Sequence, residues 1–394
     1  PKSTFLWNML GLAKLELKDT KGGIADIKKA LALNPFYYGA LLNYSRGLKD
    51  IGEPKSAIKP LLKAKNLKPD REDAYNNLGG VYEQLNEDKE AEFNLKKAIE
   101  IRPDYANARH TLGIVQLKNY RFAEGWEYIE SRFETEHFDS KRTISSEQSQ
   151  WNGEKVGTLF AWAEQGVGDE AMFASAYSDL LKRCDKLLVS ATDRMIPALS
   201  RSFRSENIEF FDRKEALTNI PSFDAHAPMM TAVGKVRPDL SSFREAGCAF
   251  LCADPTRFNK IREELRKASG GSPIYGISWF SLAKWFGSQR TVKLHKLVKC
   301  LPENAYLVSL QYGNFSEDLE KLKRDHGVEV HSVKSVNNFV DLEGLFALIS
   351  ACDRVVSIDN STVHFAGALG VPCDVVLPFN ASWRWGSNGS KTSY

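Results

Sequence analysis

The chain has 394 residues, more than one hydrophobic core usually organises, so two or three domains are expected. Hydrophobic residues make up 43% of it and charged residues 26%, the balance of an ordinary globular protein. The 53 lysine and arginine residues nearly match the 50 aspartate and glutamate residues, which argues against a nucleic-acid-binding surface. No apolar run approaches the roughly 20 residues of a membrane span.

Six cysteines are scattered along the chain. The only close pair, Cys248 and Cys252, has no second pair or histidine that would complete a zinc pattern. We therefore expect small buried side chains in a reducing compartment, no bound metal and a cytoplasmic location.

An internal repeat occupies the N-terminal third. Pro35, Pro69 and Pro103 are 34 residues apart, which is the tetratricopeptide period, and Leu78 and Gly79 match the L-G of its consensus. Each unit is predicted to form two amphipathic helices, the second ending before the proline because proline has no backbone N–H to donate. Residues 1–135 resemble an all-α tetratricopeptide-repeat solenoid of about 3.5–4 repeats, and a polar linker is expected over 136–155.

The fourth unit departs from the repeat consensus at several large or unusual side chains. These side chains either cap the solenoid or also dock it on the domain that follows. They are Phe122, Gly125, Trp126, Tyr128 and Arg132.

The first helix of each tetratricopeptide unit lines a concave groove that suits an extended peptide. Asparagine side chains bind a peptide backbone without reading its sequence, because each offers a donor and an acceptor. The candidate groove residues are Asn43, Tyr75, Asn76, Asn77 and Arg109. We expect a protein acceptor, or an acceptor held by a protein, to bind there; the alternative is that the repeats only assemble copies of the chain into a homo-oligomer.

Beyond residue 151, short apolar runs alternate with helical patterns, which indicates parallel sheets built from βαβ units. The expected strands are 158–163, 187–191, 208–211, 274–280, 306–310, 328–332, 354–358 and 374–377. We expect a Rossmann-like N-terminal lobe over 156–250, an interlobe helix or hinge over 251–271, and a second lobe over 272–394. Ligands of such α/β folds bind in the crevice outside the carboxyl ends of the strands.

The first candidate site is A-E-Q-G-V-G-D-E, residues 163–170, between a predicted strand and a predicted helix. Its glycines permit a tight turn and close approach of a ligand, and a helix N-terminus favours an anion. Asp169 is the candidate general base that removes a proton from an acceptor hydroxyl. The competing interpretation is that Asp169 caps an ordinary strand–helix turn. The other residues of this cleft loop are Glu164, Gln165, Gly166, Gly168 and Glu170, and both glutamates are alternatives for the base.

The second candidate site is S-I-D-N-S-T-V-H-F-A-G-A-L-G-V-P, residues 357–372. A strand is predicted to end just before Asp359, which places hydroxyls and free backbone N–H groups at a helix start that suits a diphosphate. His364 lies one turn into that helix. The alternative is a helix that is simply capped by its own side chains. The candidate phosphate-binding residues are Asp359, Asn360, Ser361, Thr362 and His364.

Three further segments complete the candidate donor site. The loop over 276–292 carries Lys284 and Arg290, two cations that would neutralise a nucleotide diphosphate. Gln311 ends a predicted strand, where we expect it to hydrogen-bond a base or sugar. The W-R-W run at 383–385 is expected either to pack between the lobes or to contact a ligand.

The order of these motifs is similar to that of a known family. A Gly-Asp loop, a lysine-bearing loop, S-L-Q and then D-x-x-x-x-H before A-x-A-L-G-x-P resemble the ADP-heptose:lipopolysaccharide heptosyltransferase family. The E-Q-G-x-G-D loop with W-R-W near the end is more similar to bacterial tetratricopeptide-repeat glycosyltransferases. The resemblance covers roughly residues 120–394. It implies an α/β two-lobed GT-B fold, inverting metal-independent transfer, and a nucleotide-sugar donor held mainly by the C-terminal lobe.

By position, the resemblance makes Asp169 the catalytic base and places Lys284 near the phosphate-binding lysine of the family. Asp359 and His364 match the ends of its D-T-G-x-x-H site. The Thr-Gly of that pattern is Asn-Ser here, and no W-P follows the lysine, so heptose is not supported as the sugar. The repeats are similar in plan to O-GlcNAc transferase, in which repeats present a polypeptide acceptor.

The sequence thus indicates a glycosyltransferase that moves a sugar from a nucleotide-sugar donor, with no further cofactor, to a protein or a protein-held acceptor. Two alternatives stay open. One is a catalytically inactive repeat scaffold or peptide-binding protein with a vestigial nucleotide site, and the other is a transferase acting on a lipopolysaccharide-type glycan.

Overall fold

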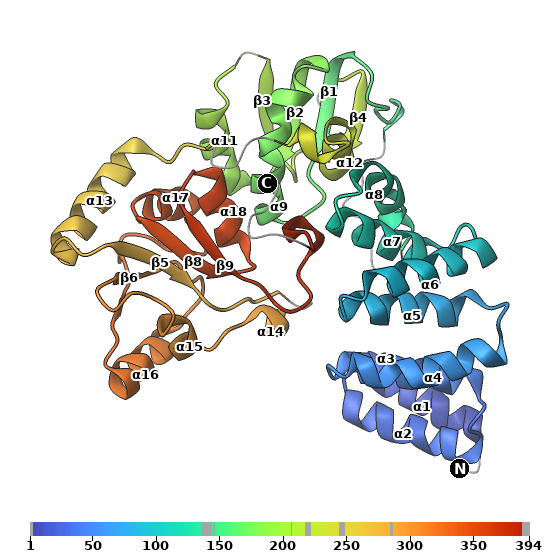
Figure 1. Cartoon of the computed structure of the whole chain (residues 1–394). Coiled ribbons are helices and arrows are strands. Elements are labelled where there is room, and N and C mark those ends of the chain that lie inside the picture. The colour runs from blue at the N-terminus through green and yellow to red at the C-terminus, as the bar shows by residue number, and fades with distance from the viewer. Residues whose placement is uncertain are drawn as a thin grey trace. The chain divides into compact units, whose positions relative to one another are not determined.

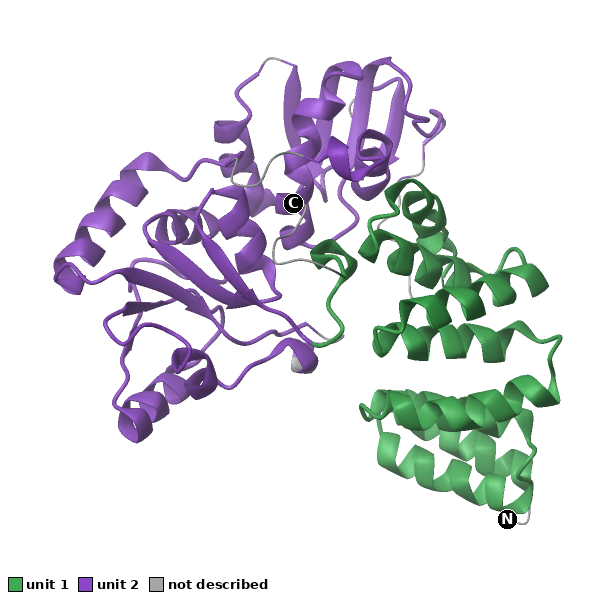
Figure 2. Cartoon of the chain, in the orientation of Figure 1, with its two compact units in different colours: residues 1–140, 379–392 green, residues 141–378, 393–394 purple. Residues whose placement is uncertain are grey.

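The computed structural model describes residues 3–135, 144, 146–205, 207–216, 222–243, 249–283 and 287–387. The chain divides into two compact units (Figure 2). Unit 1 comprises residues 1–140 and 379–392, and unit 2 comprises residues 141–378 and 393–394. No helix in the described ranges is long and apolar enough to cross a membrane.

Unit 1 is a solenoid of antiparallel helix pairs, as the 34-residue period predicts (Figure 1). The helices are α1 (Thr4–Glu16), α2 (Thr20–Leu33), α3 (Tyr38–Asp50), α4 (Pro54–Leu67), α5 (Glu72–Gln84), α6 (Asp88–Ile101), α7 (Ala106–Lys118) and α8 (Phe122–Ile129), and a short 3₁₀ turn, η1 (Glu130–Glu134), follows them. Each of α2, α4 and α6 ends two residues before Pro35, Pro69 or Pro103, which confirms the predicted helix ends. Each pair is one repeat, numbered 1 to 4 in chain order.

Small residues let the paired helices approach closely. Ala30, Ala64 and Ala98 are completely buried at the same phase of repeats 1 to 3. A Cβ on Gly79 would lie 2.5 Å from Leu95 Cγ, so α5 crosses α6 at this distance only because position 79 has no side chain. The repeat period therefore fixes which positions are small as well as where the helices end.

The C-terminal segment 379–387 belongs with the repeats, which corrects the expected second lobe over 272–394 at that end. Asn86 donates a hydrogen bond to the Phe379 carbonyl over 2.6 Å, and the Ser387 backbone N–H donates to the Lys118 carbonyl over 2.9 Å. Between these points, Asn380 donates to Glu83 over 3.0 Å. The segment thus lies along the ends of α5 and α7.

The W-R-W run forms a 3₁₀ turn, η6 (Trp383–Trp385), packed on the fourth repeat. The Trp383 and Trp126 rings meet edge to face with 5.4 Å between their centroids, and both side chains are more than nine-tenths buried. Gly386 turns the chain with φ of +70°, and a Cβ there would lie 2.0 Å from the Tyr120 hydroxyl. The aromatic partner of Trp383 is Trp126, so the W-R-W run packs on α7 and α8 and not between the lobes, as one of the two expectations had it.

Unit 2 contains two parallel sheets, and this confirms the expectation of parallel sheets with helices in the C-terminal part (Figure 1). The strands are β1 (Val156–Trp162), β2 (Cys184–Ala191), β3 (Ile208–Asp212), β4 (Ala225–Pro228), β5 (Ile274–Ser278), β6 (Tyr306–Ser309), β7 (Val330–His331), β8 (Arg354–Ile358) and β9 (Cys373–Val376). The first sheet has the order β3-β2-β1-β4 and the second β7-β6-β5-β8-β9. In both, the strand order reverses beside the first strand, so the topological switch points lie between β1 and β4 and between β5 and β8.

Helices connect the strands and separate the two sheets. They are α9 (Val167–Phe173), α10 (Tyr177–Leu180), α11 (Ile196–Ser202), α12 (Met229–Val236), α13 (Pro255–Ser269), α14 (Gly287–Arg290), α15 (Leu294–Val298), α16 (Ser316–His326), α17 (Leu342–Ser350) and α18 (Ser361–Ala368). Helix α13 is the charged helix predicted between the lobes. Its N-cap is Asp254, whose carboxylate accepts from the Arg257 N–H over 2.8 Å, and Gly270 ends it with φ of +57°.

Strand β4 was not predicted, because Ala-His-Ala-Pro lacks the β-branched residues that mark strands. Its outer edge is partly paired by residues of the expected linker 136–155. The His226 N–H donates to the Ser149 carbonyl over 3.3 Å, and the Trp151 N–H donates to the His226 carbonyl over 2.7 Å. Residues 149–151 therefore belong to the sheet of the first lobe, which corrects the linker at its C-terminal end.

The cysteines only partly follow the expectation of buried thiols. Every described cysteine is free. Cys184 and Cys352 are buried, whereas Cys252 and Cys300 are exposed. Cys248 lies outside the described residues.

Replacing Trp383 with alanine is expected to loosen the segment 379–387 from the fourth repeat. We expect a loss of roughly 2 kcal/mol, less than for a Trp in a closed core, because the segment 379–387 can detach from the repeat instead of leaving a cavity. Hydrogen exchange of the full chain measures this as faster exchange in α7 and α8. Phe379→Ala is the matched control, since the Phe379 side chain is 78% exposed. Equal protection of α7 in both variants would contradict the assignment.

Candidate functional site

The two sequence motifs of unit 2 lie against each other. Helix α9 starts directly after the β1 loop, and α18 starts directly after β8. A Cβ on Gly168 would lie 3.2 Å from both Ser361 Oγ and His364 Cδ2, so the two helix starts pack together through a position with no side chain. Asp169 follows Gly168 in the chain. The structure thus brings a carboxylate of the first lobe and the Ser361–His364 turn of the second lobe to one place.

Asp169 takes part in the turn that opens α9. Its Oδ2 atom accepts a hydrogen bond from the Gly166 backbone N–H over 3.3 Å, and its side chain is half-buried. This contact helps to cap α9, but it is not the one that the competing interpretation predicts, because Gly166 is the N-cap residue and Asp169 is the third residue of the helix. A bond of that length is a weak one. The role of Asp169 as a base stays a prediction.

Glu170 stabilises the first lobe through contacts between its loops. Its carboxylate accepts from the Thr192 N–H and hydroxyl, both over 2.8 Å, and lies 3.2 Å from Arg213 Nη1. Arg213 also donates to the Gln165 carbonyl over 3.2 Å. Burial raises the pKa of Glu170 above its ordinary value. Glu170 therefore ties the loops after β1, β2 and β3 together and positions the Asp169 turn. Glu164, the other alternative base, is 2% exposed.

Gln311 uses its side-chain amide within the protein. Its Oε1 atom accepts from the Ser278 hydroxyl over 3.1 Å and from the Trp279 and Phe280 backbone N–H groups over 2.9 Å each. Its Nε2 group donates to the carbonyls of Phe280 and Tyr312. The amide thus fixes the loop that follows β5. Contact of Gln311 with a base or sugar stays a prediction, and in this structure its donors and acceptor are occupied.

Asn360 caps α18 and links it to β5. Its Oδ1 atom accepts from the Thr362 N–H over 3.0 Å, and its Nδ2 group donates to the Ser278 hydroxyl over 2.8 Å. The expectation of free N–H groups at this helix start is therefore wrong for Thr362, whose side chain is also 2% exposed. Ser361 and His364 are half-buried.

Asp359 and Arg290 meet at the switch point of the second sheet, a pairing that the sequence did not predict. The Asp359 side chain is almost completely buried, and its Oδ2 atom lies 3.3 Å from Arg290 Nε. Arg290 comes from α14, on the loop after β5, and remains partly exposed. Lys284, the second predicted cation, lies outside the described residues.

The predicted groove residues lie on α3, α5 and α7, the first helices of repeats 2 to 4. All five are half-buried. Asn43 donates to Asn8 Oδ1 over 3.0 Å, and Asn76 donates to Asn77 over 3.4 Å. Burial lowers the pKa of His110, next to Arg109, to about 4, so the imidazole is neutral at pH 7.

Several of these contact residues were not predicted from the sequence. Asn8 precedes Asn76, one of the predicted groove residues, by 68 residues, which is two repeat periods, so the repeat spacing was a usable signal. Ser278 and Thr192 carry no such signal, since a lone hydroxyl at the end of a strand is common. Arg213 follows β3 as Glu170 follows β1, and only the sheet order places them together.

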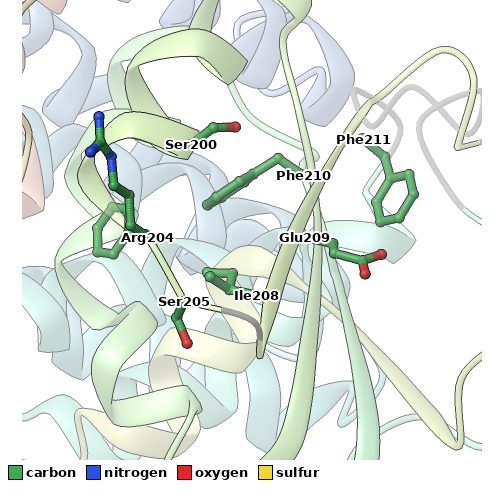
Figure 3. A pocket seen from close by; sticks show the side chains of 8 residues that line it. Ser200, Arg204, Ser205, Ile208, Glu209, Phe210 and Phe211 are labelled. Atoms are coloured by element: carbon green, nitrogen blue, oxygen red, sulfur yellow. The ribbon is translucent and has the colours of Figure 1, made fainter.

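A separate pocket of about 320 Å³ lies between α11 and the edge strand β3 (Figure 3). Its lining mixes apolar rings with Arg204 and Glu209. None of the predicted site residues lines it. The motif loops therefore remain the candidate site.

A match to a protein family supports the repeats. The tetratricopeptide-repeat family matches residues 6–37 and 72–105. Protein FlbA of Caulobacter vibrioides is 28% identical over 97% of this chain, and the match spans 61% of the length of FlbA. The crystal structure of MamA protein is 29% identical with a TM-score of 0.30 and covers 33% of this chain and 72% of that chain. A thermophilic tetratricopeptide-repeat protein of Thermus thermophilus is 21% identical with a TM-score of 0.32 and covers 35% of this chain and 77% of that chain.

Replacing Gln311 with methionine is expected to destabilise unit 2. The change keeps the size of the side chain but leaves the Trp279 and Phe280 N–H groups without their acceptor, at a cost of about 2–4 kcal/mol. Differential scanning calorimetry of the full chain measures the shift of the unfolding transition. Gln148→Met is the control, since Gln148 is exposed and outside this network. Equal transition temperatures for both variants would show that the amide is dispensable.

Proposed function

We propose that unit 2 is a glycosyltransferase of the GT-B type that transfers a sugar from a nucleotide-sugar donor, with inversion and without a metal. One observation carries the proposal. The Gly166–Asp169 turn and the Ser361–His364 turn, each at the carboxyl edge of a parallel sheet beside its switch point, are packed together through Gly168. Ligands of doubly wound sheets bind at such edges.

The chemistry assigns different tasks to the two turns. In an inverting transfer, the acceptor hydroxyl attacks the anomeric carbon and loses its proton to a base, while the nucleoside diphosphate leaves with the bonding electron pair. Asp169 is the proposed base. Arg290, the α18 start and His364, together with Lys284, are proposed to stabilise the charge that develops on the diphosphate.

The repeats suggest protein interaction. Tetratricopeptide repeats typically bind peptides or proteins, and the candidate groove residues on α3, α5 and α7 are polar and only half-buried. We extend the proposal to the acceptor: a protein, or a carrier held by a protein, binds along these helices. A lipopolysaccharide-type glycan is the alternative acceptor.

A protein-interaction scaffold without catalysis is the second candidate function. The observation that favours it is the internal use of Gln311 and Asn360, whose amides bind the protein's own backbone and hydroxyls. Under this proposal the α/β unit is structurally intact and the repeats carry the function. The two proposals differ in whether Asp169 supports turnover.

Replacing Asp169 with asparagine tests the enzyme. We expect turnover across a panel of nucleotide sugars to fall by about 10² or more while nucleotide binding persists, because general base catalysis contributes ~10²–10⁴. Asp193→Asn is the control, since Asp193 is an exposed carboxylate of the same lobe. Intact protein that neither binds nucleotides nor turns over any donor would favour the scaffold.

A second prediction separates the acceptor from the donor. Asn76→Ala combined with Arg109→Ala is expected to lower transfer to a protein acceptor several-fold, since these side chains are proposed to hold its backbone. Donor hydrolysis by the same variant should stay at the wild-type rate. Undiminished protein transfer would remove the repeats from the acceptor site and leave the proposed donor chemistry untouched.

A further inference from the structure

A groove of about 620 Å³ lies on repeats 1 and 2, and none of the candidate acceptor residues lines it. Its walls come from the end of α2 with the turn that follows it, from α3, and above all from the second helix of repeat 2, α4. Its lining includes Phe36, Tyr44, Lys59, Leu62, Lys63 and Leu67.

The groove exposes large apolar side chains. Phe36 is 63% exposed, Leu62 37% and Leu67 39%. They lie in one groove with Pro35 and Pro60, so their surfaces form a continuous patch. Contiguous apolar patches on a protein surface mark interaction sites, whereas single exposed apolar residues do not.

The rim of the groove is positively charged. Helix α4 carries four lysines between Pro54 and Leu67 and no aspartate or glutamate. Lys63 Nζ lies 4.2 Å from the centroid of the Phe36 ring, so this ammonium stands directly over the apolar patch. Among the described residues, neither Lys59 nor Lys63 forms an ion pair with a carboxylate.

This charge is a property of α4 and not of the repeat. The equivalent helix of repeat 3, α6, mixes lysines with acidic residues. Its Lys96 and Lys97 are paired with Glu92 and Glu100 on the same helix. Helix α2 likewise pairs Lys29 with Asp26. Lys59 and Lys63 of α4 therefore remain available to carboxylates from outside the chain.

We infer that this groove binds an acidic amphipathic segment of a partner protein. Apolar side chains of the segment fill the space between Phe36, Leu62 and Leu67, and its aspartate or glutamate residues pair with Lys59 and Lys63. Burial of the apolar patch provides affinity, and the lysine rim selects the charge of the partner and its register. No candidate acceptor residue lines this groove, so the inference stands without the proposed function.

The test uses fluorescence anisotropy with the full chain and a labelled synthetic peptide in which leucine and phenylalanine at helical spacing alternate with glutamate. A matched peptide with lysine in place of glutamate is the charge control. We expect saturable binding of the acidic peptide only, weakened by added salt. The absence of saturable binding, or equal binding of both peptides, would overturn the inference.

Variants then locate the site. Lys59→Glu with Lys63→Glu is expected to weaken binding by at least about tenfold, and Leu62→Ser by a similar factor. The charge-matched control is Lys21→Glu with Lys55→Glu, and the apolar control is Leu33→Ser, since these exposed residues do not line the groove. Equal losses in test and control variants would show non-specific attraction. Loss of binding only in Asn76→Ala with Arg109→Ala would place the peptide on the first helices instead.

Discussion

A buried chain of hydrogen bonds through Ser278 is the constraint on which the second lobe depends. The Ser278 hydroxyl has one hydrogen, which it donates to Gln311, so it must accept from Asn360. This fixed direction joins the end of β5 to the loop after β6 on one side and to the start of α18 on the other. Because all three side chains are buried, breaking one bond leaves its partners unsatisfied, and the three strand ends hold their positions together.

In the first lobe, the ion pair between Glu170 and Arg213 holds the strand ends in place, as the Ser278 hydrogen bonds do in the second lobe. Glu170 and Arg213 join the loops that follow β1, β2 and β3. Burial of the Glu170 carboxyl at this junction raises its pKa above the ordinary value. Each sheet therefore presents a carboxyl edge that is organised before any ligand arrives. Binding to a site that is already ordered costs less conformational entropy than binding to a site that the ligand must first order. Gly168 then lets the two edges touch where a side chain would hold them apart.

The repeats and most strands follow from the sequence because periodicity and β-branched runs are local signals. Strand β4 is the exception, since its pairing is dictated by β1 and not by its own residues. Asn360 shows a deeper limit. An amide side chain at a helix start can bind a phosphate or cap the N–H groups of its own helix, and the sequence does not distinguish these roles. Here the hydrogen bond from Asn360 to Ser278 favours the capping role. Trp383 shows a second limit. Its ring partner, Trp126, lies in the fourth repeat, far from Trp383 in the sequence, so no local pattern identifies the pair.

The docked C-terminal segment divides the solenoid into two halves with different surfaces. Asn86, Lys118 and Trp126 of repeats 3 and 4 are engaged by residues 379–387, and the buried Lys118 ammonium lies 3.4 Å from Asn380 Oδ1. An outside chain must displace that segment to reach those positions. The contacts of residues 379–387 described above all fall in repeats 3 and 4. The second helix of repeat 2, α4, carries four lysines and no aspartate or glutamate between Pro54 and Leu67. The proposed recognition of a partner by charge thus belongs to the N-terminal half of the array, while Asn86, Lys118 and Trp126 of the C-terminal half hold the segment 379–387.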